Sequence, residues 1–213
     1  MDRQQAYIRE LFATEDDILS DVVTRTKDIT ESIQIRPEDG KLLQTLIRLG
    51  NIKNIIEIGT LAGYSALWMS RVLPKDGHIH TIEKTPNRHA LATETLAGIT
   101  NVTQHFGEAL DILKTLTPKA PFDMIFIDAD KHNYLNYLDW AEQNIRQHGL
   151  IIADNTLLSG AVYKGDDSPL PAHIRPTTLQ DMRLFNQRLA DPEKYCSTLL
   201  PTPDGMTIAV KLF

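Results

Sequence analysis

Short apolar runs separated by longer amphipathic stretches recur from residue 54 to residue 213. Several runs are almost continuously β-branched or aromatic, as strands are when both of their faces are buried. We read seven strands, at 54–59, 78–83, 101–106, 122–129, 149–155, 197–201 and 207–213. The stretches between the first five runs, such as 63–73 and 132–145, have apolar residues at helical spacing. The pattern therefore predicts an α/β fold with a doubly wound, mostly parallel, seven-stranded sheet and helices on both faces.

The last two strands are expected to form an antiparallel hairpin at the C-terminal edge. Only Pro-Thr-Pro-Asp-Gly, residues 201–205, separates the two runs, and Pro, Asp and Gly favour a tight reversal. Before the hairpin, the Pro-rich stretch 166–176 is interpreted as a surface loop, after which a helix resumes at Thr178 or Leu179.

Two helices are predicted ahead of the first strand, at 3–25 and 37–49. Pro37 suits a first helical turn, and Gly50 suits a C-terminal stop.

We expect one domain over 1–213, with N-terminal helices in 1–50 and an α/β core in 51–213. No internal repeat or low-complexity tract divides the chain. Three aromatic residues at helical positions are expected to belong to the core: Trp68, Tyr134 and Trp140.

The composition is that of an ordinary globular protein with a mildly acidic balance. Lys+Arg 22 minus Asp+Glu 28 gives a net charge of −6, which offers no general attraction to nucleic acid or anionic lipid. The single cysteine, Cys196, excludes an intramolecular disulfide and a multi-cysteine metal site. No stretch approaches the ~20 apolar residues of a membrane span, and the first residues are unlike a secretory signal. We therefore expect a cytoplasmic protein without a membrane partner.

A glycine turn follows the first strand. Glu57 lies near the strand end, Gly59 allows a sharp turn, and Gly63 lets the backbone approach a ligand at the start of a helix. Glu83 ends the second strand about 20 residues further on, where an acid can accept hydrogen bonds from the ribose hydroxyls of a nucleoside. Small residues and acids also occur at ordinary strand ends, but the combination favours a nucleoside cofactor. The pattern alone does not separate S-adenosylmethionine from NAD.

Oxygen-bearing side chains follow the fourth and fifth strands. Asp128, Asp130, Asp154 and Asn155 are expected at the sheet edge where ligands bind in such folds. Carboxylates held together repel each other unless a cation or protons compensate. The alternative is that these residues only end strands and cap helices. Taken together, the two strand ends favour a hard divalent cation: Mg²⁺ first, with Mn²⁺ or Ca²⁺ as alternatives.

Lys131 follows these carboxylates directly. Beside a divalent cation its ammonium group is expected to titrate below its ordinary pKa of about 10.4, which would suit a general base. An exposed lysine that balances nearby acids is the other interpretation.

These segments together resemble the metal- and S-adenosylmethionine-dependent O-methyltransferase family that contains catechol and caffeoyl-CoA O-methyltransferases, and in particular its small bacterial members. The resemblance runs from about Ile33 to the C-terminus. Its landmarks are EIGTLAGYS, HIHTIE, GEALD, FIDADKHNY, IADN and DGMTIAVKL. It implies a Rossmann-like methyltransferase fold, S-adenosylmethionine as cofactor, a divalent cation and a homodimer.

The family pattern assigns roles to individual residues of this chain. It implies a cofactor site formed by Ile35, Glu57, Gly59, Thr60, Gly63, Ser65, Glu83, Ala109 and Asp130. It implies a metal site formed by Asp128, Asp154 and Asn155. It makes Lys131 the catalytic base, acting beside Asp128.

The expected substrate is a small catechol-like or phenylpropanoid-like aromatic. The chain has Ala129-Asp130 where the catechol enzymes have His-Trp, and its N-terminal arm is short for binding an acyl-CoA. The main alternative is an RNA (tRNA) methyltransferase with the same cofactor site, which the acidic charge disfavours. A cofactor-sensing module without catalysis and an NAD-dependent dehydrogenase are further alternatives.

Overall fold

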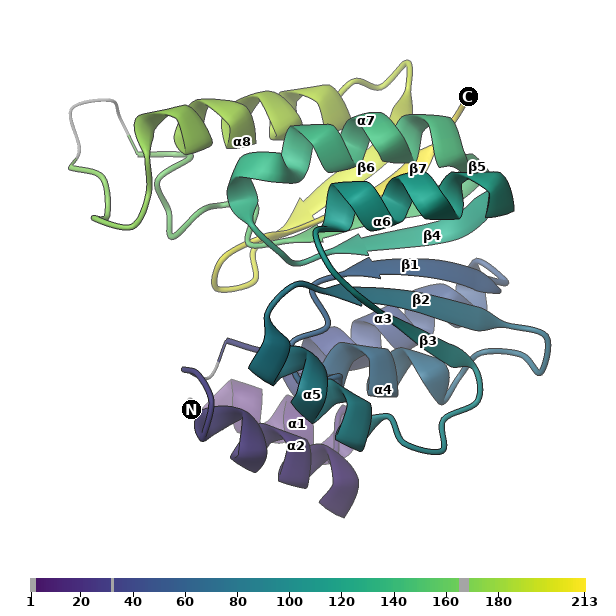
Figure 1. Cartoon of the computed structure of the whole chain (residues 1–213). Helices are drawn as coiled ribbons and strands as arrows, with labels where there is room; N and C mark the ends of the chain where they lie inside the picture. Colours follow the sequence, from purple (N-terminus) through teal and green to yellow (C-terminus); the bar gives the residue numbers. More distant parts are fainter. Residues whose placement is uncertain (1–2, 32, 165–168) are drawn as a thin grey trace. The chain divides into compact units, whose positions relative to one another are not determined.

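The computed structural model describes residues 3–31, 33–164 and 169–213. The chain divides into two compact units, Met1–Ile112 and Leu113–Phe213. In the part that the structure describes there are seven strands, three in the first unit and four in the second. Each unit is described separately below (Figure 1).

The first unit begins with three helices, α1 (Arg3–Phe12), α2 (Asp17–Lys27) and α3 (Pro37–Leu49). The single helix predicted at 3–25 is therefore wrong, because the chain breaks before Asp17. The Asp16 side chain accepts a hydrogen bond from the backbone N–H of Leu19 at 3.0 Å and caps a new helix. The helix predicted at 37–49 is confirmed, with Pro37 in the first turn and Gly50 at the C-cap.

Three parallel strands form the sheet of the first unit: β1 (Asn54–Ile58), β2 (His78–Glu83) and β3 (Val102–Phe106). Their order is β3-β2-β1, and Glu57 lies opposite Thr81 in the register of β1 and β2. The crossovers contain α4 (Tyr64–Ser70) and α5 (Pro86–Thr95). In Figure 1, α3, α4 and α5 lie on one side of these strands.

The strand predicted at 101–106 is confirmed as β3, which is less buried than β1 and β2. None of the five residues of β3 is fully buried, and Phe106 is 53% exposed. β3 is the edge strand of its unit and pairs only with β2 among the strands of that unit, so part of its surface stays open. After it, α6 (Ala109–Leu116) and a short 3-10 helix (Thr117–Lys119) lead into the second unit.

The second unit has four strands in the order β4-β5-β7-β6. They are β4 (Phe122–Ile127), β5 (Ile145–Asp154), β6 (Tyr195–Leu200) and β7 (Met206–Lys211). β4 and β5 are parallel, whereas β7 is antiparallel to both β5 and β6. The hairpin predicted at residues 201–205 is thus confirmed.

Two long helices, α7 (Tyr134–Asn144) and α8 (Pro176–Leu189), pack against each other over this sheet (Figure 1). A 3-10 helix, η2 (Lys131–Asn133), precedes α7 directly. The loop predicted at 166–176 is observed at its described residues up to Arg175; residues 165–168 lie outside the described part. α8 begins at Pro176, two or three residues earlier than the predicted start at Thr178 or Leu179.

Two of the three predicted core aromatics are confirmed. Trp68 is 4% exposed, and Tyr134 is fully buried. Trp140 is only partly buried, and its indole N–H donates a hydrogen bond to the Thr117 hydroxyl at 3.0 Å. The prediction that Trp140 belongs to the core is therefore wrong, because its indole N–H is hydrogen-bonded near the surface.

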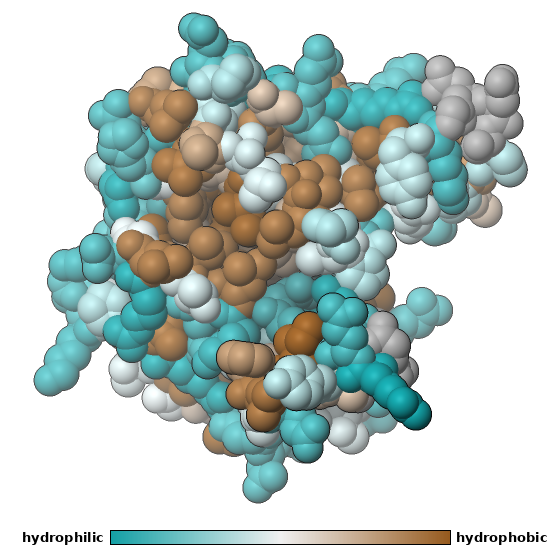
Figure 2. All heavy atoms as spheres, turned by 180° about the vertical axis from the view of Figure 1, so that it is seen from behind, coloured by the Kyte–Doolittle hydropathy of each residue, from teal (hydrophilic) through white to brown (hydrophobic). Residues whose placement is uncertain are grey.

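No helix in the described residues is long and apolar enough to cross a membrane. Figure 2 views the molecule from behind and shows apolar residues gathered on part of that surface.

Candidate functional site

The turn after β1 forms a buried polar network in the first unit. The Glu57 carboxylate is fully buried and accepts hydrogen bonds from the Ser65 and Thr81 hydroxyls, each at 2.5 Å. The Thr60 hydroxyl lies 2.5 Å from that of Thr81. The network thus joins three of the predicted cofactor residues, Glu57, Thr60 and Ser65, through Thr81, which the sequence analysis did not single out. Burying a carboxylate is costly without such donors, so its position is closely fixed.

Both predicted turn glycines adopt the left-handed backbone conformation, with φ of 101° at Gly59 and 86° at Gly63. Gly59 donates its backbone N–H to the Ile82 carbonyl at 3.0 Å, which ties the turn to β2. The conformation of Gly63 disfavours any other residue, and a Cβ there would also make a tight contact of 3.0 Å with the Leu96 side chain.

Glu83 ends β2 and is 6% exposed. Its two carboxylate oxygens accept the backbone N–H groups of Leu61, at 3.0 Å, and of Thr85, at 2.8 Å. Its carbonyl also accepts the N–H of Gly107 at 3.0 Å. Glu83 therefore links the glycine turn to the segment that follows β3, and each carboxylate oxygen keeps a second lone pair for a ligand hydroxyl.

Ile35 and Ala109 are buried in the same unit, at 5% and 8% exposure. Their predicted cofactor contacts stay predictions.

In the second unit, the residues predicted to bind the metal follow two adjacent parallel strands. Ile127 of β4 lies opposite Ala153 of β5, so Asp128 and Asp154 come next at the same sheet edge. Asn155 has a left-handed φ of 58°, and its backbone N–H donates to the Asp154 carboxylate at 2.8 Å. Asn tolerates this conformation better than most residues.

Tyr134 connects the two strand ends. Its hydroxyl lies 2.9 Å from the Asp154 carbonyl and 3.3 Å from the Ile127 carbonyl. Burial is the main cause that raises the pKa of Tyr134 above its ordinary value, so this phenol stays protonated and can donate. The sequence analysis treated Tyr134 as a core residue; its ring is in the core, but its hydroxyl belongs to the site.

Lys131 lies between these groups. Its ammonium group is 3.2 Å from Asp128 Oδ1 and 2.9 Å from the Tyr134 hydroxyl. Burial by itself lowers the pKa of Lys131, but the neighbouring Tyr134 and Asp128 outweigh burial and raise it. The protein groups alone thus shift this pKa in the direction opposite to that expected beside a cation, because Asp128 compensates the ammonium charge.

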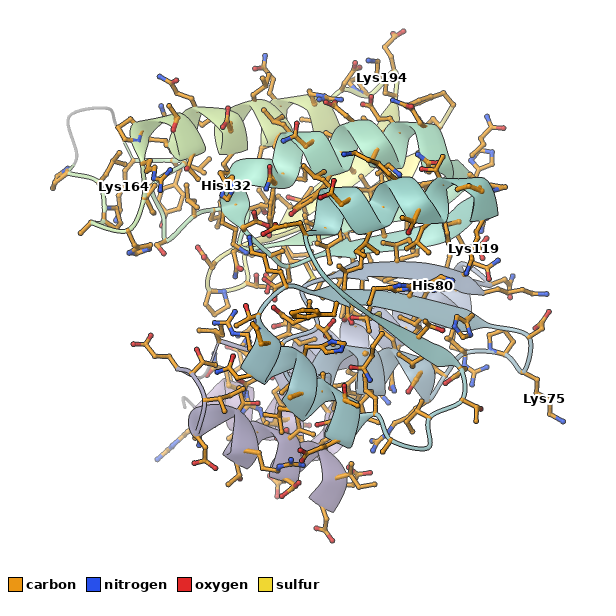
Figure 3. All side chains as sticks on the ribbon, viewed as in Figure 1. Lys75, His80, Lys119, His132, Lys164 and Lys194 are labelled. Carbon is orange, nitrogen blue, oxygen red and sulfur yellow. The ribbon has the colours of Figure 1, made fainter. Side chains whose placement is uncertain are left out.

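Asp130, the next carboxylate along the chain, is hydrogen-bonded to other donors. Its carboxylate accepts the Tyr137 hydroxyl and the Asn133 amide, each at 2.6 Å. His132 lies 3.1 Å from the same carboxylate. His132 projects from the segment after β4 (Figure 3).

Asp128, Asp154 and Asn155 offer oxygen atoms that are chemically suited to bind a hard divalent cation. This proposed ligand set consists of two carboxylates and an amide, and neither carboxylate is fully exposed: Asp154 is 8% exposed and the Asp128 side chain 19%. Among residues 3–31, 33–164 and 169–213, no group of three His, Cys, Asp or Glu side chains is placed to hold a metal. An amide-containing set is compatible with that finding, since only two of its three members are carboxylates.

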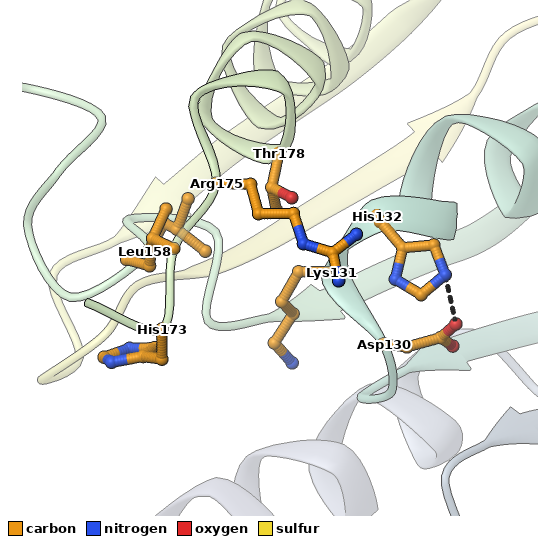
Figure 4. Close-up of a pocket in the computed structure, with 8 residues that line it drawn as sticks. Asp130, Lys131, His132, Leu158, His173, Arg175 and Thr178 are labelled. Atoms are coloured by element: carbon orange, nitrogen blue, oxygen red, sulfur yellow. Dashed lines mark ion pairs between the residues drawn. The ribbon is translucent and has the colours of Figure 1, made fainter. Parts of the chain in front are cut away.

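A pocket opens beside Lys131 in the second unit (Figure 4). It has a volume of about 230 Å³. Its lining residues come from the segment after β4 and from the region between β5 and α8: Asp130, Lys131, His132, Leu158, His173, Ile174, Arg175 and Thr178. Apart from Asp130 and Lys131, none of these residues was a predicted site residue, because nothing in the sequence pattern shows how the loop before α8 folds back.

Comparison with known proteins identifies the family. The family model described as O-methyltransferase matches residues 9–212. The chain is 40% identical over 218 residues to a catechol O-methyltransferase from Niastella koreensis, covering 96% of this chain and 94% of that protein. It is 35% identical over 182 residues to caffeoyl-CoA O-methyltransferase 1 from Eucalyptus globulus, covering 82% and 73% of the two chains.

The structure is also similar to that of the O-methyltransferase TomG from Streptomyces achromogenes, which is involved in tomaymycin synthesis and was solved in complex with S-adenosylmethionine. The TM-score is 0.87 at 33% identity, and all of both chains is covered. This similarity confirms the predicted Rossmann-like methyltransferase fold. The chain belongs to the O-methyltransferase family and is an enzyme of that family.

Proposed function

We propose that this enzyme transfers the methyl group of S-adenosylmethionine to one hydroxyl of a small vicinal diphenol, with the help of a divalent cation. The observation that carries the proposal is the cluster of Asp128, Lys131, Tyr134 and Asp154 at the ends of two adjacent parallel strands. A general base next to oxygen ligands for a cation is what deprotonation of a phenol requires.

The cofactor proposal rests on the first unit and on the relatives. Glu57, Thr60 and Ser65 share one buried network, and Glu83 fixes the glycine turn that contains Gly59 and Gly63. The TomG structure contains S-adenosylmethionine. Ile35, Ala109 and Asp130 are proposed to complete the cofactor site, as the family pattern implies.

Asp128, Asp154 and Asn155 would hold the cation, with Mg²⁺ as the first choice and Mn²⁺ or Ca²⁺ as alternatives. When bound, such an ion lowers the pKa of a coordinated phenol from its ordinary value of about 10. The positive charge of the bound cation would lower the pKa of Lys131. The neutral amine that results would be placed to accept the proton that the acceptor hydroxyl loses. Tyr134 orients the Lys131 ammonium group and holds the backbone of Asp154.

Methyl transfer from a sulfonium is an in-line displacement. The acceptor oxygen must therefore lie close to the methyl carbon, opposite the sulfur atom, and much of the rate enhancement comes from that alignment. As the carbon–oxygen bond forms and the carbon–sulfur bond breaks, the positive charge on sulfur disappears. A site of low polarity favours such a loss of charge.

We further propose a homodimer, a single catalytic domain over residues 1–213 and a cytoplasmic location. The dimer proposal has one local argument. Ile208 and Val210 lie on one face of β7 and are only partly buried, and their partners across the strand pair are Thr198 and Cys196, both exposed. A partly apolar sheet face suits a second copy of the chain.

The test is incubation of the purified enzyme with methyl-labelled S-adenosylmethionine and three classes of acceptor: vicinal diphenols, phenols with one hydroxyl, and total RNA. We expect label in a vicinal diphenol and little label elsewhere. Label in RNA would favour the alternative of an RNA methyltransferase. Equal rates of methyl transfer to phenols with one hydroxyl and to vicinal diphenols would contradict the proposal that both hydroxyls of the acceptor bind the cation.

A further inference from the structure

The pocket beside Lys131 has a basic lining with an apolar floor. Leu158 and Ile174 are buried, at 5% and 7% exposure, and supply apolar surface. Four of the eight lining residues carry basic groups: Lys131, His132, His173 and Arg175. Asp130 is the one acid of the lining, so the balance of the pocket wall is positive.

The charges of Lys131 and Asp130 are already compensated within the protein. Lys131 pairs with Asp128 at 3.2 Å, and Asp130 accepts hydrogen bonds from Tyr137 and Asn133. His132 lies 3.1 Å from Asp130. His173 interacts electrostatically with Asp204. Among the described residues, Arg175 is the basic group of the lining that has no acid within ion-pair distance.

Arg175 is placed to meet a ligand. It is the N-cap residue of α8, but its side chain makes no capping hydrogen bond. In Figure 4 its guanidinium group extends toward His132 over the pocket that Lys131 also lines. Thr178, in the first turn of α8, lines the same pocket, and backbone N–H groups in a first helical turn lack partners within the helix. A guanidinium group matches the geometry of a carboxylate with two parallel hydrogen bonds.

We propose that the acceptor is a vicinal diphenol with a carboxylate on its ring or on a short side chain, and that Arg175 selects for this carboxylate. The inference rests on the proposed function, since the acceptor hydroxyls are assigned to the neighbourhood of Lys131. The apolar surface of Leu158 and Ile174 would contact the ring, and Arg175 would receive the carboxylate.

A matched pair of substrates tests the charge alone: 3,4-dihydroxybenzoate and its methyl ester. The two differ in charge but share the ring and both hydroxyls. We expect kcat/KM of the wild type to favour the acid, and because the pocket rim is exposed and screened, roughly fivefold is the expected size. Arg175→Gln should bring the ratio close to one by lowering kcat/KM for the acid far more than for the ester.

Arg188→Gln is the matched control on the same helix. Arg188 pairs with Asp139 at 2.6 Å and with Glu142 at 3.0 Å, and it does not line the pocket. This variant should keep the preference of the wild type for the acid. Equal use of acid and ester by the wild type, or an unchanged ratio in Arg175→Gln, would overturn the proposal. So would a strong preference for a coenzyme A thioester over the free acid.

Measurements of ligand affinity distinguish a failure of the carboxylate site from a failure of the proposed function. Calorimetry with S-adenosylhomocysteine present measures the affinity of the acid and of the ester without any methyl transfer. If no diphenol is methylated but the acid binds more tightly than the ester through Arg175, the proposed function fails and the carboxylate site stands. If diphenols are methylated and the two ligands bind equally, the carboxylate site fails and the proposed function stands.

Discussion

The Tyr134 hydroxyl lies 2.9 Å from the backbone carbonyl of Asp154, so a core side chain of α7 fixes the end of β5 that carries a proposed metal ligand. The same hydroxyl accepts a hydrogen bond from Lys131 at 2.9 Å. One phenol therefore positions both the proposed base and the backbone beside it. Its ring is fully buried, which leaves little freedom for either partner to move.

Tyr134→Phe should reduce both stability and activity. Loss of a buried hydroxyl leaves the Asp154 carbonyl without this donor and should lower the free energy of unfolding by about 1–3 kcal/mol. kcat should fall because Lys131 loses a partner. Tyr195→Phe is the control, since it also loses one hydrogen bond, to Glu142 at 2.6 Å, and lies outside the site. Equal kcat values for the two variants would show that Tyr134 has a structural role only.

Lys131→Ala should lower kcat by roughly 10²–10⁴-fold, the usual contribution of a positioned general base. The affinity for S-adenosylhomocysteine, measured by calorimetry, should stay close to that of the wild type. The rise of kcat with pH should also change, because a different group, or water, must take the proton. Lys119→Ala, at an exposed lysine of the same unit, should alter none of these properties. A pH–rate profile of Lys131→Ala that matches the wild type would remove the base role.

Glu83→Gln should weaken the binding of S-adenosylmethionine by roughly tenfold, since a charged acceptor for the ribose hydroxyls becomes a neutral one. The amide keeps one acceptor oxygen but cannot accept from both Leu61 and Thr85. Glu94→Gln is the control: that carboxylate pairs with Arg25 and is 66% exposed. Calorimetry with S-adenosylhomocysteine gives the comparison. Unchanged affinity in Glu83→Gln would mean that this acid only holds the turn.

The pKa of Asp204 predicts how one part of the protein's stability depends on pH. Burial raises the pKa of Asp204 in spite of a hydrogen bond from the Ser159 N–H, so ionisation costs more in the folded chain than in the unfolded chain. The contribution of Asp204 to stability should therefore fall as pH rises from the ordinary pKa of about 3.9 to the raised value. Asp204→Asn keeps an acceptor for Ser159 and removes the charge. In EDTA it should melt above the wild type at pH 7, and the difference should vanish below pH ~4.

Asp76→Asn should show the opposite sign. A hydrogen bond from Lys53 lowers the pKa of Asp76, so the wild type gains stability as pH rises through that group's titration. This exposed variant should melt slightly below the wild type at pH 7. Thermal melts of both variants between pH 3 and pH 8 check the two signs together. A lower melting temperature for Asp204→Asn at pH 7 would contradict the first prediction.

The apolar pattern predicted the strands well because buried parallel strands need nearly continuous apolar runs. β2 and α3 have the predicted bounds, 78–83 and 37–49. The break between α1 and α2 was missed, since the capping role of Asp16 depends on a short local geometry that an amphipathic pattern does not encode. Strand ends such as Glu83 were identifiable because parallel topology brings them to one edge.

Other parts of the site could not be predicted. Thr81 and Tyr134 are ordinary strand and core residues by pattern, and only the packing shows where their hydroxyls point. Arg175 lies in a Pro-rich stretch without periodicity, and its approach to Lys131 depends on how the loop before α8 folds. Long-range placement of this kind has no local signal in the sequence.

The most direct test of the central claim is methyl transfer to a vicinal diphenol before and after removal of divalent cations. The purified enzyme is treated with EDTA, dialysed, and assayed by mass spectrometry with S-adenosylmethionine, first without metal and then with added Mg²⁺. We predict that the product, with one added methyl group, is lost with EDTA and returns with Mg²⁺, while Asp154→Ala stays inactive at every Mg²⁺ concentration. Full activity in EDTA, or an active Asp154→Ala enzyme, would contradict the metal-assisted mechanism.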